Sequence, residues 1–134
     1  MIDLEEAQAA GVAPWTELVQ EDFHVAVFAD KFPVAPGHLL FVPKFNTEGV
    51  IKDALGDAYN YGAHKVALGE WQGFNVGLNI GQVAGQTVMY PHVHLIPRSA
   101  GDVEDPVGGV RNVIPGRGNY QKSINLLVDE EKFQ

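Results

Sequence analysis

The feature that most constrains this chain is an alternation of side chains over residues 88 to 96, inside the segment GQTVMYPHVHLIPR. A two-residue period predicts an extended strand, because successive side chains of a strand point to opposite faces. His92 and His94 therefore share a face with Val88, Tyr90 and Ile96, and the other face carries Met89, Val93 and Leu95. At about 3.3 Å per residue, the two imidazoles lie roughly 6.6 Å apart along the strand.

Other segments predict the elements around this strand. Residues 24–30 and 38–44 are rich in β-branched and aromatic residues and flank a turn with proline and glycine, which predicts an antiparallel pair. Residues 47–70 follow a helical period behind Asn46 or Thr47 as a cap, with Gly56 and Gly62 weakening the helix, and residues 3–11 predict a short helix. Residues 74–80 alternate as a strand does. The order predicts an α+β fold, a mostly antiparallel sheet with the long helix on one face.

The length of 134 residues suits one domain with a real core. We expect a single domain over residues 1–134, with its core at about 14–120. Residues 99–120 are too rich in glycine and proline for regular structure, and a polar tail follows.

Charge and composition exclude several classes of function. The formal net charge of −8 argues against broad electrostatic binding to nucleic acid or to an anionic membrane. No apolar run reaches the roughly 18 residues that span a bilayer, and the acidic N-terminus is unlike a signal peptide. With no cysteine, disulfides and thiol catalysis are excluded, and we expect the protein to be cytoplasmic.

Two histidines on one strand face are compatible with three kinds of site. They can hold two corners of a zinc or iron site that takes a third ligand elsewhere. One imidazole can attack phosphorus while its neighbour donates a proton. Both can also be structural, hydrogen-bonded within a half-buried face. Nearby polar groups of the kind that stabilise a phosphoryl transition state are Gln86, Thr87, Asn79 and the backbone amides of the Gly85 turn.

The same residues resemble a known family. GQTVMYPHVHLIPR looks like the signature of the histidine triad (HIT) superfamily, in which three histidines alternate with apolar residues after Gln-Ser/Thr-Val. Residues 25–44 resemble the family's entry strand, its proline-glycine-histidine turn and the strand that follows, and residues 73–88 resemble its Asn-x-Gly segment. GGVRNVIPGRGNY, further on, is similar to a bacterial branch of diadenosine polyphosphate hydrolases. The resemblance implies a HIT-like five-stranded sheet with one long helix and a short N-terminal helix.

The resemblance also implies roles for individual residues. His92 matches the nucleophile on the α-phosphate, and His94 matches the histidine that contacts phosphate and assists the leaving group. Gln86 is assigned to catalysis with them. The implied substrate-binding residues include the Gln86–Thr87 phosphate pair, the ribose-binding acid Asp30 and the buttressing His38; the full set is Asp30, Phe28, Lys31, Asn79, Thr87, Gly85, His38 and Tyr90.

Tyr90 departs from the family pattern, because it stands where the first histidine of the triad belongs. The fold implies that this position holds the nucleophile through its backbone carbonyl, which tyrosine keeps. The side-chain link toward His38 is lost, although a phenol still forms hydrogen bonds. Pro91 is a second departure, and its missing amide hydrogen suits an edge or the first position of a strand.

We therefore expect a nucleotide hydrolase that cleaves at the α-phosphate of dinucleoside polyphosphates through a covalent nucleotidyl-histidine. The alternatives are a nucleoside phosphoramidate hydrolase, a nucleotidyl transferase, or a nucleotide-binding module that Tyr90 has made inactive. We expect no metal or cofactor in the protein, although magnesium can accompany a polyphosphate substrate. The resemblance also implies a homodimer in which the sheet continues across the interface.

Overall fold

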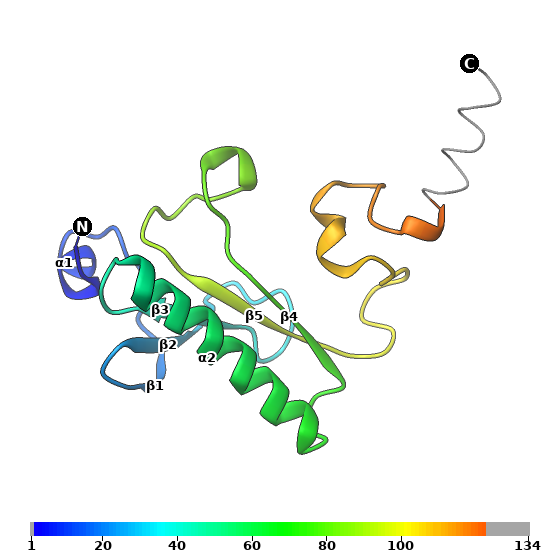
Figure 1. Ribbon diagram of the computed structural model, residues 1–134, viewed down its shortest axis with the longest axis horizontal. Helices are drawn as coiled ribbons and strands as arrows, with labels where there is room; N and C mark the ends of the chain where they lie inside the picture. Colours follow the sequence, from blue (N-terminus) through cyan, green and yellow to red (C-terminus); the bar gives the residue numbers. More distant parts are fainter. Residues whose placement is uncertain (1, 123–134) are drawn as a thin grey trace. The chain divides into compact units, whose positions relative to one another are not determined.

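The computed structural model describes residues 2–122, which divide into two compact units between Ser99 and Ala100. The first unit contains a five-stranded sheet of order β1-β2-β3-β5-β4 in which every neighbouring pair is antiparallel (Figure 1). The strands are β1 (Leu18–Glu21), β2 (Val25–Ala29), β3 (Leu39–Pro43), β4 (Gly73–Gly77) and β5 (Val93–Arg98). This confirms the predicted five-stranded α+β fold with one long and one short helix.

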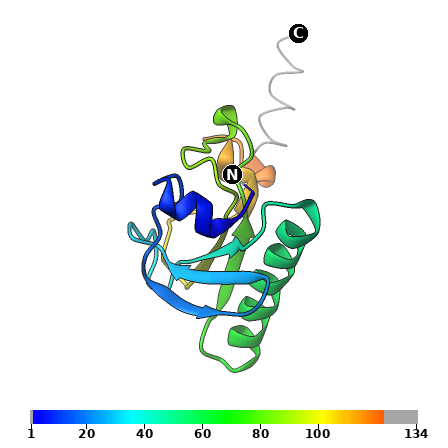
Figure 2. The same ribbon diagram turned by 90° about the vertical axis from the view of Figure 1, so that its left-hand side faces the viewer.

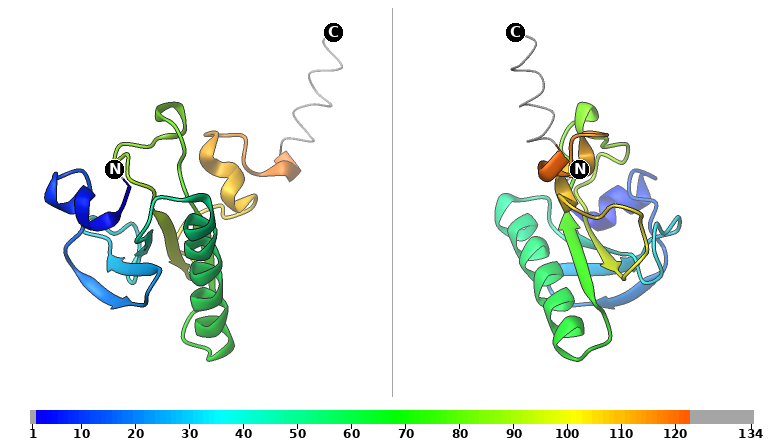
Figure 3. Two further views of the ribbon diagram at one scale, coloured as in Figure 1. Left: turned by 60° about the vertical axis from the view of Figure 1, so that its left-hand side comes forward. Right: turned by 90° about the vertical axis from the view of Figure 1, so that its right-hand side faces the viewer.

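The long helix α2 (Glu48–Ala67) covers one face of the sheet (Figures 2 and 3). Of the two predicted caps, Asn46 and Thr47, Thr47 is the N-cap, and its hydroxyl oxygen accepts a hydrogen bond from the amide of Val50 at 3.4 Å. The helix buries Ala54, Ala58 and Gly62, whose small size lets its backbone approach the sheet closely. Below it lie the buried side chains of Val25, Val27, Leu39, Phe41, Val93 and Leu95.

The short helix α1 (Leu4–Ala9) packs on the opposite face. Asp3 caps it by accepting a hydrogen bond from the amide of Glu6 at 2.8 Å, and Leu4 and Ala7 are buried. These two residues join a second core cluster with Ala13, Trp15, Ala26, Phe28, Leu40, Val42 and Tyr90. The sheet therefore separates a face covered by α2 from a face on which the N-terminal segment packs together with Tyr90.

The order of the strands places the histidines in the interior of the sheet. Helix α2 connects β3 to β4, and β5 then inserts between these two strands and pairs with both. In this register His94 lies opposite Leu40 on β3 and Gly77 on β4. Because Val93, Leu95 and Pro97 are buried under α2, His92 and His94 point to the other face.

The structure differs from the predicted strands at three places. Strand β5 begins at Val93 rather than at residue 88, because Pro91 has no amide hydrogen for the ladder. Met89 is exposed, unlike Val93 and Leu95. Strand β4 ends at Gly77, which leaves Ile80 exposed. Strand β1 was not predicted, because all four of its residues are exposed and carry no apolar pattern.

In the second unit, residues 100–119 contain one 3-10 helix, Gly109–Val113, and no other helix or strand, as their glycine and proline content predicts. The polar tail predicted beyond residue 120 lies almost wholly outside the described residues. The single domain over residues 1–134 remains a prediction. Within residues 2–122, none of the helices has both the length and the apolar character that crossing a membrane requires.

Candidate active site

A pocket of about 470 Å³ opens on the sheet face that α2 leaves free, within the usual size for small-molecule sites. Most of the predicted site residues line it: Asp30, Lys31, Asn79, Gly85, Gln86, Thr87, His92 and His94. The three others, Phe28, His38 and Tyr90, are buried behind it. The lining also includes residues that the sequence analysis missed: Trp15, Thr16, Glu17 and Phe32.

His92 is held by the backbone of Tyr90. Its Nδ1 lies 2.8 Å from the carbonyl oxygen of Tyr90. A carbonyl oxygen only accepts hydrogen bonds, so Nδ1 of His92 donates and carries the ring proton. In the neutral imidazole, Nε2 therefore has a free lone pair. The backbone thus fixes the tautomer that a nucleophilic histidine requires.

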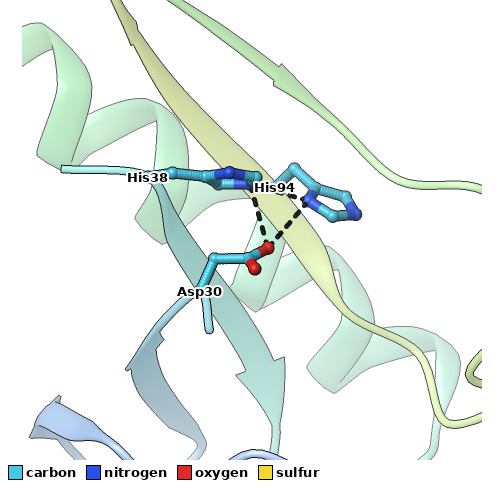
Figure 4. Close-up of side chains that lie close together, drawn as sticks. All are labelled: Asp30, His38 and His94. Atoms are coloured by element: carbon cyan, nitrogen blue, oxygen red, sulfur yellow. Dashed lines mark hydrogen bonds and ion pairs between the residues drawn. The ribbon is translucent and has the colours of Figure 1, made fainter. Parts of the chain in front are cut away.

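A second chain of hydrogen bonds fixes His94 (Figure 4). The amide of Val34 donates to Nδ1 of His38 at 3.2 Å, so the proton of neutral His38 is on Nε2. That Nε2 lies 2.9 Å from Nδ1 of His94 and 3.3 Å from Oδ2 of Asp30. Because Nε2 of His38 carries the proton, it donates to Nδ1 of His94. The proton of neutral His94 is therefore on its own Nε2. The two histidines of the pocket therefore hold opposite tautomers, one with an acceptor and the other with a donor at Nε2.

Local turn geometry brings Asp30 and His38 together. Asp30 follows the last residue of β2, and His38 precedes the first residue of β3. The backbone amide of Asp30 donates to the carbonyl of His38 at 3.1 Å, which closes the loop between them. Oδ1 of Asp30 also accepts from the amide of Phe32 at 2.8 Å, the turn role common for aspartate. The predicted contact of Asp30 with ribose remains a prediction.

Burial keeps His38 and His94 neutral. Burial, with smaller contributions from the neighbouring His92 and His38, lowers the pKa of His94 to about 4, against the opposing charge of Asp30. Burial also lowers the pKa of His38, which Asp30 partly offsets. Near neutral pH, Nε2 of His94 is consequently a hydrogen-bond donor without a second, readily transferable proton.

Gln86 is engaged with the backbone of its own loop. Its amide oxygen accepts from the amide of Gly81 at 2.9 Å, and its amide nitrogen donates to the carbonyls of Val88 and Met89 at 3.1 and 3.2 Å. The amides of Gly85 and Gln86 are also bonded inside the turn, to Gln82 and Gly81. The side chain of Gln86 thus shapes the pocket wall. The predicted phosphate contacts of Gln86 and of the Gly85 turn require an exchange of these bonds.

The side chains of Phe28 and Tyr90, both predicted to bind substrate, lie in the core rather than on the pocket wall. Phe28 is 4% exposed and belongs to the core cluster, because its place on β2 points it under Trp15. The Tyr90 hydroxyl donates to the carbonyl of Pro43 at 2.7 Å, away from His38. Burial raises the pKa of Tyr90 to about 12, so its hydroxyl keeps the proton. Tyr90 contributes its carbonyl to the site, and its side chain belongs to the core.

Among the described residues, one cluster could hold a metal ion. Its members are Asp30, His38 and His94, and their ligand atoms lie within 4.8 Å of one another. Coordination would need the lone pair of Nε2 on His38. The hydrogen bond from Val34 places the ring proton on that atom. A metal-ligating histidine normally donates from its other ring nitrogen, whereas His38 accepts there. The arrangement therefore fits a hydrogen-bonded chain better than a ligand set.

Comparison with known proteins identifies the family. The HIT domain model matches residues 14–101, so the chain belongs to the HIT domain family. It is 39% identical over 105 residues to an uncharacterised HIT-like protein of Methanocaldococcus jannaschii, covering 72% of this chain and 81% of that one. It is also 39% identical over 87 residues to the protein hit of Bacillus subtilis, and this match covers 60% of this chain and 60% of that relative.

Among solved structures, a HIT family hydrolase from Legionella pneumophila superimposes with a TM-score of 0.54 at 28% identity. The superposition covers 72% of this chain and 93% of that one. The resemblance stated from the sequence is thereby confirmed for the superfamily.

Proposed function

We propose that this protein is a nucleotide hydrolase of the histidine triad type. The observation that carries the proposal is the hydrogen bond between Nδ1 of His92 and the Tyr90 carbonyl, which places the lone pair of the neutral ring on Nε2, at the pocket. The Legionella relative described as a hydrolase supports the same class of activity. Tyr90 retains the backbone group on which this arrangement depends.

The proposed reaction has two displacements. Nε2 of His92 attacks the α-phosphorus, the bond from phosphorus to the leaving oxygen breaks, and that oxygen departs with the electron pair. Nε2 of His94, with its proton, donates a hydrogen bond to the phosphoryl oxygens, and the exposed Lys31, Asn79 and Thr87 line the same pocket. Water then attacks phosphorus, the phosphorus–nitrogen bond breaks, and the lone pair returns to His92 while water releases a proton to solvent.

The state of His94 favours some leaving groups over others. A neutral His94 stabilises negative charge but has no second proton to give to a basic leaving group. A polyphosphate departs as a stable anion, whereas an amine leaves a phosphoramidate only when it is protonated. We therefore favour dinucleoside polyphosphates as substrates over phosphoramidates, in agreement with the branch suggested by residues 108–120.

Three further expectations belong to this proposal. The hydrogen-bonded state of His38 favours a site without a resident metal, with magnesium arriving on the substrate. The lack of cysteine favours residence in the cytoplasm. We also propose a homodimer with a continuous sheet. The rival function is a nucleotide-binding module without turnover.

The test compares wild type with His92→Ala on diadenosine polyphosphates and adenosine phosphoramidate, with mass detection of a nucleotidyl adduct after rapid quenching. His64→Ala is the matched control, because His64 is exposed on α2, outside the pocket. We expect a loss of at least about 1000-fold for His92→Ala, an adduct only on His92, and faster turnover of the polyphosphate. Equal, slow turnover by wild type and His92→Ala, with AMP still bound, would leave the binding module as the function.

Stoichiometric zinc or iron in the purified protein would overturn the metal-free site.

A further inference from the structure

Trp15 packs directly against the proposed nucleophile. The centroids of its indole and of the His92 imidazole are 4.8 Å apart, with their planes tilted by 52°. Trp15 is 9% exposed, and the part that remains accessible lines the pocket. The carbonyl of Tyr90 accepts a hydrogen bond from one ring nitrogen of His92, and the indole packs against the same ring.

The indole is itself held in place by the core. It packs against Phe28 at 6.3 Å and edge-on against Tyr90 at 6.4 Å, measured between ring centroids. The hydroxyl of Tyr90 is anchored to the carbonyl of Pro43 at 2.7 Å. The side-chain amide of Gln8 on α1 donates to the carbonyl of Trp15 at 3.5 Å. Tyr90, which replaces the expected histidine, thus supports the residue that packs against His92.

The charge of His92 changes during the proposed reaction. Its Nδ1 keeps a proton throughout, because the Tyr90 carbonyl accepts from it. Once Nε2 bonds to phosphorus, the imidazole ring therefore carries a positive charge that it lacked in the free enzyme. An aromatic face attracts a cation within about 6 Å of its centroid, and tryptophan does so best. This attraction grows toward the transition state, so it accelerates the chemical step without tightening ground-state binding.

We propose that Trp15 is a positioning residue that stabilises the cationic ring of nucleotidylated His92 through its indole face. This inference rests on the proposed covalent mechanism and assigns one determinant of its rate. The competing role is a platform on which the nucleobase stacks, because Trp15 also lines the pocket. The two roles separate kinetically: charge stabilisation changes the rate of adduct formation, whereas stacking changes the affinity for nucleotide.

Variants of Trp15 provide the first test, in a Trp71→Phe background that leaves Trp15 as the sole tryptophan. Trp71 packs on the α2 side of the sheet, so this change is a control that keeps the activity. For Trp15→Leu we expect adduct formation on His92 to slow roughly 5- to 30-fold, with Trp15→Phe in between. The Kd of AMP should stay within about 3-fold. A rate within about 2-fold of wild type, or weaker AMP binding with an unchanged rate, overturns the proposal.

Fluorinated tryptophan gives a test that survives a folding defect in Trp15→Leu. Fluorine withdraws electrons from the indole face and changes its shape little, so a charge interaction weakens step by step with fluorination. We expect single-turnover adduct formation to slow progressively from tryptophan to mono- and trifluorotryptophan, while the melting temperature stays constant. A rate independent of fluorination contradicts the role of Trp15. If unmodified protein forms no adduct on His92, the covalent mechanism fails, and the role of Trp15 fails with it.

Discussion

At the scale of single residues, Tyr90 separates two roles that the family pattern assigns to one histidine. Its carbonyl accepts from His92, which requires only a backbone, and its side chain is buried with Trp15 and Phe28. The buttressing bond to His38 comes from His94 instead. The carbonyl contact is what the family resemblance implies. The place of the phenol could not be predicted, because its partner, Pro43, is distant in sequence.

Tyr90→Phe should lower stability and leave catalysis intact. The substitution removes the hydroxyl that donates to Pro43 and keeps both the ring and the carbonyl that holds His92. We expect the free energy of unfolding in urea to fall by about 1–2 kcal/mol, with kcat within about 3-fold of wild type. Tyr59→Phe is the control, because Tyr59 is 61% exposed on α2, and should change stability by less than about 0.5 kcal/mol. A large loss of kcat in Tyr90→Phe would assign the hydroxyl a direct part in catalysis.

The lowered pKa of His94 predicts how stability depends on pH. In the unfolded chain His94 binds a proton near pH 6.5, but in the folded protein only near pH 4. Between these values the unfolded state binds more protons, so stability falls as the pH falls from about 6.5 to about 4. His38, whose pKa is also lowered, acts in the same direction. Urea unfolding at pH 7, 6, 5 and 4 should show a shallower loss for His94→Asn than for wild type. An equal slope in both proteins would contradict the burial effect.

At the scale of elements, the sequence predicted those with a strong period or cap. The helical stripe and Thr47 located α2, and β-branched runs located β2 and β3. Strand β1 escaped prediction because it is an exposed edge strand without alternation. Trp15 escaped because residues 12–17 follow no period and its contact with His92 joins distant parts of the chain. The sequence thus located the residues of the site that lie in motifs, and missed those that tertiary packing brings there.

Gly62 in α2 shows why propensity alone misjudges an element. By helix propensity Gly62 is a weak point of α2, yet a Cβ there would lie 2.7 Å from the ring of Phe74 on β4. Gly62→Ala should therefore destabilise the protein by about 1–3 kcal/mol despite the better helix propensity of alanine. Gly56→Ala in the same helix has open space around its Cβ and should stabilise by up to about 1 kcal/mol. Thermal or urea unfolding of the two variants measures both changes in stability. A stabilised Gly62→Ala would contradict the close packing of α2 on β4.

At the scale of the whole molecule, the proposed homodimer needs an edge at which the sheet can continue. The two edges of this sheet are β1 and β4. The last residue of β1 is the charged Glu21, whose Oε2 forms an ion pair with Nζ of Lys44 at 3.0 Å. Strand β4, GFNVG, has no charged residue. Charges on an edge strand oppose pairing with another chain. Strand β4 is therefore the edge at which we expect two copies to join.

A charge at the β4 edge should separate the two copies without unfolding either. Gly73 begins β4, and a Cβ added there would lie 4.0 Å from its nearest neighbour, the Cβ of Arg98, so Gly73→Lys fits sterically. We expect sedimentation velocity to find a dimer for wild type and a monomer for Gly73→Lys at the same concentration, with an unchanged circular dichroism spectrum. Val19→Lys on β1, where Val19 is 50% exposed, is the matched control and should remain dimeric. A wild type that stays monomeric at every concentration contradicts the dimer, and dissociation by Val19→Lys alone moves the interface to β1.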